Sequence, residues 1–244
     1  MDEDERLRAA VERLYTEFEL YPLKPVTDVC WHCHSPEEEH ALHLVPMRQM
    51  TADNLKGFAS DVLMTWGDLA DFKHFLPRLF EIVAVDHFTD DYPDIETVLG
   101  ALDRGDWTTW PAAEQQAVRE FLGAFWTESL NSWPSNYEIE TVLAAIAEAE
   151  ADLSPYLAAW DSAEGAAPVL HFCDLLLQNA ARIALGKRLS NPWLGRFPDR
   201  ESQVRDWLQR ERPVFAPKAE AQFLATTDEH ALERLSAALD IIDQ

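Results

Sequence analysis

The chain has 244 residues, of which 47% are hydrophobic and 11% aromatic, so it carries enough apolar material to bury a core. Its 44 acidic and 20 basic side chains leave a net charge of -24, which argues against direct binding to nucleic acid or to an anionic membrane surface. Eight glycines against 14 prolines favour helices separated by proline-marked turns over strands and hairpins.

The first predicted element is an amphipathic helix, because apolar residues recur at three- and four-residue spacing from Leu7 to Phe18. The pattern then stops, and residues 19–50 are expected to form an irregular loop rich in Cys and His with one short helix. Ser35 is predicted to cap that short helix, with Glu38 as its partner in a capping box.

Three helical hairpins are predicted beyond this loop, over residues 51–86, 111–149 and 166–210. The apolar residues of the first hairpin recur in the second hairpin 63 positions later; Phe58, for example, corresponds to Phe121. A similar stripe opens the third range. Its partner helix is predicted to carry three apolar residues that follow a proline-containing loop: Val204, Trp207 and Leu208.

Each hairpin leaves one apolar face that only a neighbouring hairpin can cover. We therefore predict an all-α fold of stacked helical hairpins, either an α-solenoid of the HEAT or armadillo kind or an irregular helical bundle. No linker rich in Gly, Ser or Pro interrupts the sequence, so a single helical domain over residues 1–244 is expected.

The stretch Cys30-Trp31-His32-Cys33-His34 is the first candidate for chemistry. Two thiols separated by two residues can bind one zinc ion, and the remaining ligands would be imidazoles: His32, His34, His40, His43 or the more distant His74. A metal in this position would order the loop and would be structural. The alternatives are that Cys30 and Cys33 are small buried hydrophobes or that they form a redox dithiol, although no βαβ context surrounds them.

The stretch Thr65–Arg78 is the second candidate, because it concentrates charged side chains at the turn of the first hairpin. One interpretation makes four of them a site: Asp68, Asp71, His74 and Arg78. The interpretation that we favour gives them structural roles, in which Gly67 ends one helix and Asp68 caps the next. Pro77 lies inside the apolar stripe, so this helix is expected to start near His74 or to be kinked at the proline.

Residues 25–85 resemble a family of uncharacterised bacterial proteins that combine a Cys-rich segment with a T-W-G-x-x-x-D-F-x-H-F-L-P-R block. This chain matches the block from Thr65 to Arg78 and has His32 where members often have another Cys. The resemblance brings no known activity. It implies that four residues share a metal ion, for which a structural zinc is the candidate: Cys30, His32, Cys33 and His74.

The sequence lacks a phosphate-binding glycine loop, a G-x-S-x-G elbow and an H-E-x-x-H helix, and no catalytic residue is assigned. We expect a non-catalytic helical-repeat protein that binds a basic protein partner, like an immunity protein, an antitoxin or a nucleic-acid mimic. The first alternative is a metal-dependent enzyme that uses the Cys/His cluster, with Asp68 or Asp71 as acid or base. The second is a scaffold whose groove, lined by Trp31, Trp66 or Trp133, accepts a peptide helix.

The cytoplasm is the expected compartment. The acidic residues after Met1 do not resemble a signal peptide, and no apolar run reaches the length of a bilayer span. Three cysteines, two of them close together, do not make a disulfide framework, which is consistent with a reducing environment.

Overall fold

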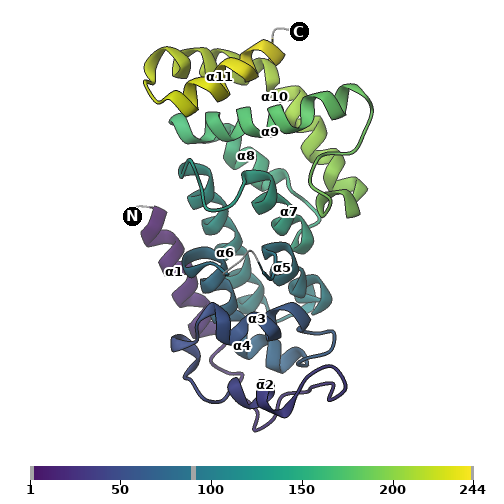
Figure 1. Ribbon diagram of the computed structural model, residues 1–244. Helices are drawn as coiled ribbons and strands as arrows, with labels where there is room; N and C mark the ends of the chain where they lie inside the picture. Colours follow the sequence, from purple (N-terminus) through teal and green to yellow (C-terminus); the bar gives the residue numbers. More distant parts are fainter. Residues whose placement is uncertain (1–2, 89–91, 243–244) are drawn as a thin grey trace. The chain divides into compact units, whose positions relative to one another are not determined.

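The computed structural model describes residues 3–88 and 92–242, and within these ranges the chain is all-α, which confirms the predicted fold class (Figure 1). The only β pairing among the described residues is two isolated bridges, Val29 with Trp66 and Val62 with Trp66. No helix in these ranges is long and apolar enough to cross a membrane. The chain divides into two compact units, residues 1–125 and 126–244, and the single-domain count stays a prediction.

In the described part of the first unit, the structure has five α-helices, the start of a sixth and three short helical turns. They are α1 (Glu3–Glu17), α2 (Pro36–Ala41), η1 (Met47–Gln49), α3 (Ala52–Asp61), α4 (Leu69–Glu81), the π-helical η2 (Ile82–Asp86), α5 (Ile95–Arg104), η4 (Trp107–Thr109) and α6 (Ala112–Asn131). α1 packs along α4, and α5 packs on both α3 and α4. Aromatic rings fill the core between them: the Phe58 and Phe75 centroids lie 4.7 Å apart, and those of Phe80 and Phe121 lie 4.9 Å apart.

α4 differs from its prediction. It begins directly after its N-cap Asp68, so the expected start near His74 is wrong, and it continues through Pro77 to Glu81. The proline removes one intrahelical hydrogen bond, but its ring and the apolar residues around it are buried, and this packing keeps the helix continuous. The prediction that Gly67 ends the preceding helix is wrong, because α3 ends at Asp61 with Val62 as its C-cap. Gly67 instead precedes the cap of α4 with a left-handed φ of 79°, a conformation that costs glycine nothing.

The second unit, described as far as residue 242, holds the end of α6 and five further α-helices. They are α7 (Ile139–Ala149), α8 (Ser154–Ser162), α9 (Ala166–Ala184), α10 (Pro198–Ala225) and α11 (Glu229–Ile242), with the short turn η5 (Leu194–Arg196) before α10. α9, α10 and α11 all pack on one another. The rings of Phe172 and Phe215 stack at 4.0 Å between α9 and α10. α10 carries the predicted partner stripe of α9 and runs well beyond the expected end at residue 210.

Candidate functional site

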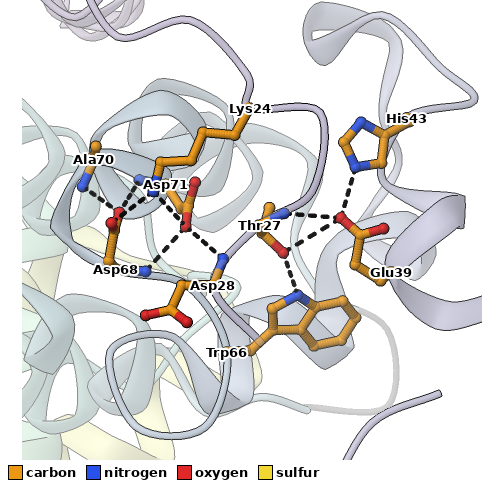
Figure 2. A network of polar contacts seen from close by, with 9 residues as sticks. All are labelled: Lys24, Thr27, Asp28, Glu39, His43, Trp66, Asp68, Ala70 and Asp71. Carbon is orange, nitrogen blue, oxygen red and sulfur yellow. Dashed lines mark hydrogen bonds and ion pairs between the residues drawn. The ribbon is translucent and has the colours of Figure 1, made fainter. Parts of the chain in front are cut away.

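The candidate site is the irregular segment 19–50, called here the Cys/His loop, together with residues 65–78, called the anchor segment. Backbone and side-chain groups of the anchor segment hold the middle of the loop (Figure 2). Trp66 Nε1 donates to Thr27 Oγ1 at 2.9 Å, and the Gly67 N–H donates to the Asp28 carbonyl at 2.5 Å. The Cys30 N–H donates to the Thr65 carbonyl at 2.9 Å. The last two bonds satisfy backbone groups of the loop that lie outside any helix.

Asp68 is the N-cap of α4 and also binds the loop. Its Oδ1 accepts from the N–H groups of Ala70 at 2.9 Å and Asp71 at 3.0 Å, and its Oδ2 lies 2.6 Å from Lys24 Nζ. Burial alone would raise the pKa of Asp68, but the Lys24 ammonium and these N–H groups lower it below its ordinary value. The cap predicted from the sequence is confirmed, and it is part of the contact with the loop.

Asp71 has a side chain that is only 1% exposed and is the centre of the network in Figure 2. Its Oδ2 accepts from the N–H groups of Asp28 and Asp68, each at 3.0 Å, and from Lys24 Nζ at 3.2 Å. Its Oδ1 is buried and has no hydrogen-bond partner among the described residues. One carboxylate thus joins the helix cap to the loop, with the Lys24 ammonium as its counter-charge.

The short helix α2 closes the network from the other side. Glu39 is buried, and its Oε1 accepts from the Thr27 N–H at 3.0 Å and lies 2.7 Å from His43 Nε2 (Figure 2). Burial raises the pKa of Glu39, but His43 and Thr27 outweigh that effect and leave it lowered. The capping box of Ser35 and Glu38 is present as predicted.

His74 and Arg78 hold the two ends of the loop. His74 Nδ1 lies 2.7 Å from the Tyr21 carbonyl, which can only accept, so Nδ1 carries the proton and Nε2 has the lone pair. Burial lowers the pKa of His74 below its ordinary value. Arg78 Nε donates to the Met50 carbonyl at 2.6 Å. The polar residues of the anchor segment therefore have structural partners, as in the interpretation that we favoured.

A buried ion pair that the sequence did not reveal lies beside Tyr21. Lys73 Nζ is 2.6 Å from Glu114 Oε2, and the two side chains are 6% and 5% exposed. The Tyr21 hydroxyl donates to Glu114 Oε1 at 2.6 Å, and Lys73 Nζ lies 4.3 Å above the Trp110 ring. Forty-one residues separate Lys73 from Glu114, so no local spacing could have indicated the pair.

Cys30 and Cys33 are exposed at the surface of the Cys/His loop, with Trp31 55% exposed between them. A tight turn supports them, because the N–H groups of Cys33 and His34 donate to the Cys30 carbonyl at 2.9 and 3.1 Å. Hydrogen bonds to the Cys30 sulfur from the His32 N–H, the Cys33 thiol and the Cys33 N–H lower the pKa of Cys30. The alternative in which Cys30 and Cys33 are small buried hydrophobic residues is wrong, because both lie at the surface.

The predicted metal ligands are not gathered into one set. Among the residues that the structure describes, no group of three or more His, Cys, Asp or Glu side chains is placed to hold a metal ion. His74 faces the Tyr21 carbonyl, while Cys30, His32 and Cys33 are exposed on the turn. A zinc ion bound by Cys30, His32, Cys33 and His74 stays a prediction.

Thiol reactivity should follow this geometry. We expect a chromogenic disulfide reagent at pH 8 to label Cys30 and Cys33 within seconds to minutes in the native protein. The third thiol should react only after unfolding, because burial in α9 raises the pKa of Cys173 to about 12. The reduced protein would be followed with and without denaturant. Labelling of three thiols in the native state would contradict the placement of Cys173.

The geometry defines a class: an all-α protein in which the start of one helix anchors an exposed Cys/His loop. Comparison with protein-family models, with curated proteins and with solved structures finds no significant match. The resemblance to uncharacterised bacterial proteins over residues 25–85 therefore stays a prediction.

Proposed function

We propose that the chain is a non-catalytic protein that binds a basic protein partner through the outer surface of the Cys/His loop. The observation that carries this proposal is that five large apolar side chains of the loop and the adjacent turn are each 51–81% exposed: Leu20, Val26, Trp31, Leu44 and Met64. Exposed apolar side chains favour association with another protein. Because the loop is fixed from beneath by the anchor segment, little conformational entropy would be lost on binding.

Charge supports a basic partner. The nearby cations already have carboxylate partners within the chain: Lys24 with Asp68 and Asp71, Arg48 with Glu12 at 2.7 Å, and Lys56 with Asp53 at 3.1 Å. Glu37 and Glu38 are exposed on α2. The loop therefore offers a partner exposed apolar side chains together with negative charge from nearby carboxylates. This combination favours partners with Lys- and Arg-rich surfaces.

Immunity proteins, antitoxins and nucleic-acid mimics all bind basic partners, and the proposal covers these three kinds of protein, acting in the cytoplasm. The enzyme alternative requires Asp68 or Asp71 as acid or base. Both carboxylates already accept hydrogen bonds from the start of α4 and pair with Lys24, which makes the catalytic role the weaker candidate.

The proposal can be tested with a displayed library of random peptides, selected against the full chain in low salt with a chelator and a reductant present. We expect the enriched peptides to be basic and to contain apolar residues. Their affinity should fall more than tenfold when Trp31 is replaced by serine, and steeply as salt rises. The matched control is Leu224→Ser, because Leu224 is an exposed apolar residue on α10 in the other unit.

The proposal fails if the selected peptides are neutral or acidic, or if no peptide is enriched. It also fails if Trp31→Ser and Leu224→Ser weaken binding equally, because the Cys/His loop would then have no special part in it.

A further inference from the structure

The connection from α9 to α10, together with the helix ends on either side, concentrates positive charge in a chain whose net charge is -24. Residues 182–200 include five basic residues and one acidic residue, Asp199. Four of the five are exposed and the fifth, Arg200, is half-buried. They are called here the basic row: Arg182, Lys187, Arg188, Arg196 and Arg200. A local excess of one sign of charge attracts ligands of the opposite sign.

Hydrogen bonds connect the first three members of the row. The Lys187 N–H donates to the Arg182 carbonyl at 2.8 Å, and Arg182 Nε donates to the Arg188 carbonyl at 2.8 Å. Arg188 Nη1 donates to the carbonyl of Gly195, which precedes Arg196 in the sequence. Because a carbonyl group carries no net charge, these bonds orient the guanidinium groups and leave their positive charge in place.

The last two members of the row lie at the end of α7. Arg196 Nη1 is 3.2 Å from Glu148 Oε1, and Arg200 Nη1 donates to the Ala147 carbonyl. Because Ala147 and Glu148 are neighbours in the last turn of α7, Arg196 and Arg200 lie close together. The row is thus continuous from the end of α9 to the start of α10.

Carboxylates neutralise only part of the row. Arg196 pairs with Glu148, and Arg188 Nε is 4.0 Å from Glu201 Oε2. Glu201 is shared, because its Oε1 lies 2.7 Å from Arg205. Three members have no carboxylate partner among the residues that the structure describes: Arg182, Lys187 and Arg200. The row therefore keeps positive charge that a ligand can neutralise.

We propose that the basic row binds an acidic segment of another protein, one that carries several Asp or Glu residues and at least one apolar side chain. A guanidinium group binds a carboxylate through two parallel N–H groups, so a row of arginines matches a series of carboxylates. Leu185 lies between Arg182 and Lys187 in the sequence and is 69% exposed, so an apolar side chain of the partner can cover it.

Charge favours a protein segment over a nucleic acid. A nucleic acid carries a phosphate at every nucleotide and would extend beyond the row onto a chain that is acidic overall. A short peptide can keep its carboxylates within the row. The inference does not rest on the proposed function, because that function assigns a basic partner to the Cys/His loop, whereas the basic row belongs to the second unit.

The test uses the reduced full-length chain in low salt and a short fluorescent peptide composed of Asp, Glu and Leu. Fluorescence anisotropy should show saturable binding, which weakens more than tenfold when Asn and Gln replace the acidic residues of the peptide. An oligothymidine of the same net charge should bind more weakly than the acidic peptide. Lys187→Gln and Arg188→Gln should each weaken peptide binding about threefold to fivefold, as expected for the loss of one exposed ion pair.

Arg210→Gln is the matched control. Arg210 lies in the same unit, and its side chain is 64% exposed, as is that of Arg188, but it pairs with Glu211 at 2.7 Å. This variant should leave peptide binding unchanged. Trp31→Ser, which tests the proposed function, should also leave it unchanged.

Equal weakening by Arg188→Gln and Arg210→Gln would overturn the proposal, as would equal binding of the neutral peptide or no binding of the acidic one. Tighter binding of the oligothymidine would overturn it in favour of a nucleic acid. Self-association of the chain in low salt that is lost in Lys187→Gln, measured by light scattering, would overturn it in favour of a second copy of the chain.

Discussion

Replacing Glu114 by glutamine is expected to lower the free energy of unfolding by about 3 kcal/mol, because the change leaves the ammonium of Lys73 buried without a counter-charge. The two groups are 2.6 Å apart, and both side chains are almost fully buried. The loss should also loosen Tyr21, whose hydroxyl donates to Glu114 at 2.6 Å. Urea denaturation at neutral pH measures the change.

Two controls separate this effect from a general loss of negative charge. Glu120 lies on the same helix, and its carboxylate pairs with Arg13 at 3.2 Å on the surface. The change Glu120→Gln should therefore lower the free energy of unfolding by less than about 0.5 kcal/mol. Adding Lys73→Met to the Glu114→Gln variant should restore part of the loss, because no buried charge remains. Equal stability of Glu114→Gln and Glu120→Gln would show that the Lys73–Glu114 pair is not buried as described.

Replacing Asp71 by alanine should cost about 2–3 kcal/mol, because the N–H groups of Asp28 and Asp68 and the ammonium of Lys24 lose an acceptor together. The figure stays moderate since Lys24 is partly exposed and keeps its contact with Asp68. We also expect the Cys/His loop to become sensitive to protease. Urea denaturation and limited proteolysis followed by mass spectrometry measure the two effects.

Asp71→Asn is the matched variant, because it removes the charge but keeps an oxygen that can accept the two backbone N–H groups. It should be less destabilised than Asp71→Ala, and its loop should stay protected. If Asp71→Ala were as stable as the wild type and its loop equally resistant, the carboxylate could not be what joins the loop to α4.

The helices could be predicted from the sequence because they follow local rules. The three- and four-residue spacing of apolar residues from Leu7 to Phe18 indicated α1, and the capping box at Ser35 and the N-cap at Asp68 are short-range features. The course of α4 through Pro77 could not be predicted in this way. A proline in mid-helix usually breaks it, and only the tertiary packing of that helix overrides the local preference.

The sequence indicated the two segments of the candidate site, but it did not indicate the hydrogen bonds that join them. The sequence marked Cys30 and Cys33 by their spacing and Thr65–Arg78 by its charges. The bonds that join the two segments, such as Trp66 to Thr27 and Asp71 to Asp28, link residues about 40 positions apart. No sequence spacing encodes such contacts, because they depend on how the loop folds over α4. The resemblance grouped His74 with the thiols, and that grouping stays a prediction; in the structure His74 Nδ1 binds the Tyr21 carbonyl.

Hydrogen exchange of the loop amides tests most directly whether the anchor segment fixes the Cys/His loop. The account predicts slow exchange at Thr27, Asp28 and Cys30, whose N–H groups donate to Glu39, Asp71 and Thr65. It also predicts that protection at Asp28 is lost in Asp71→Ala. Exchange of these three amides at the rate of an unstructured peptide in the wild-type protein would contradict it.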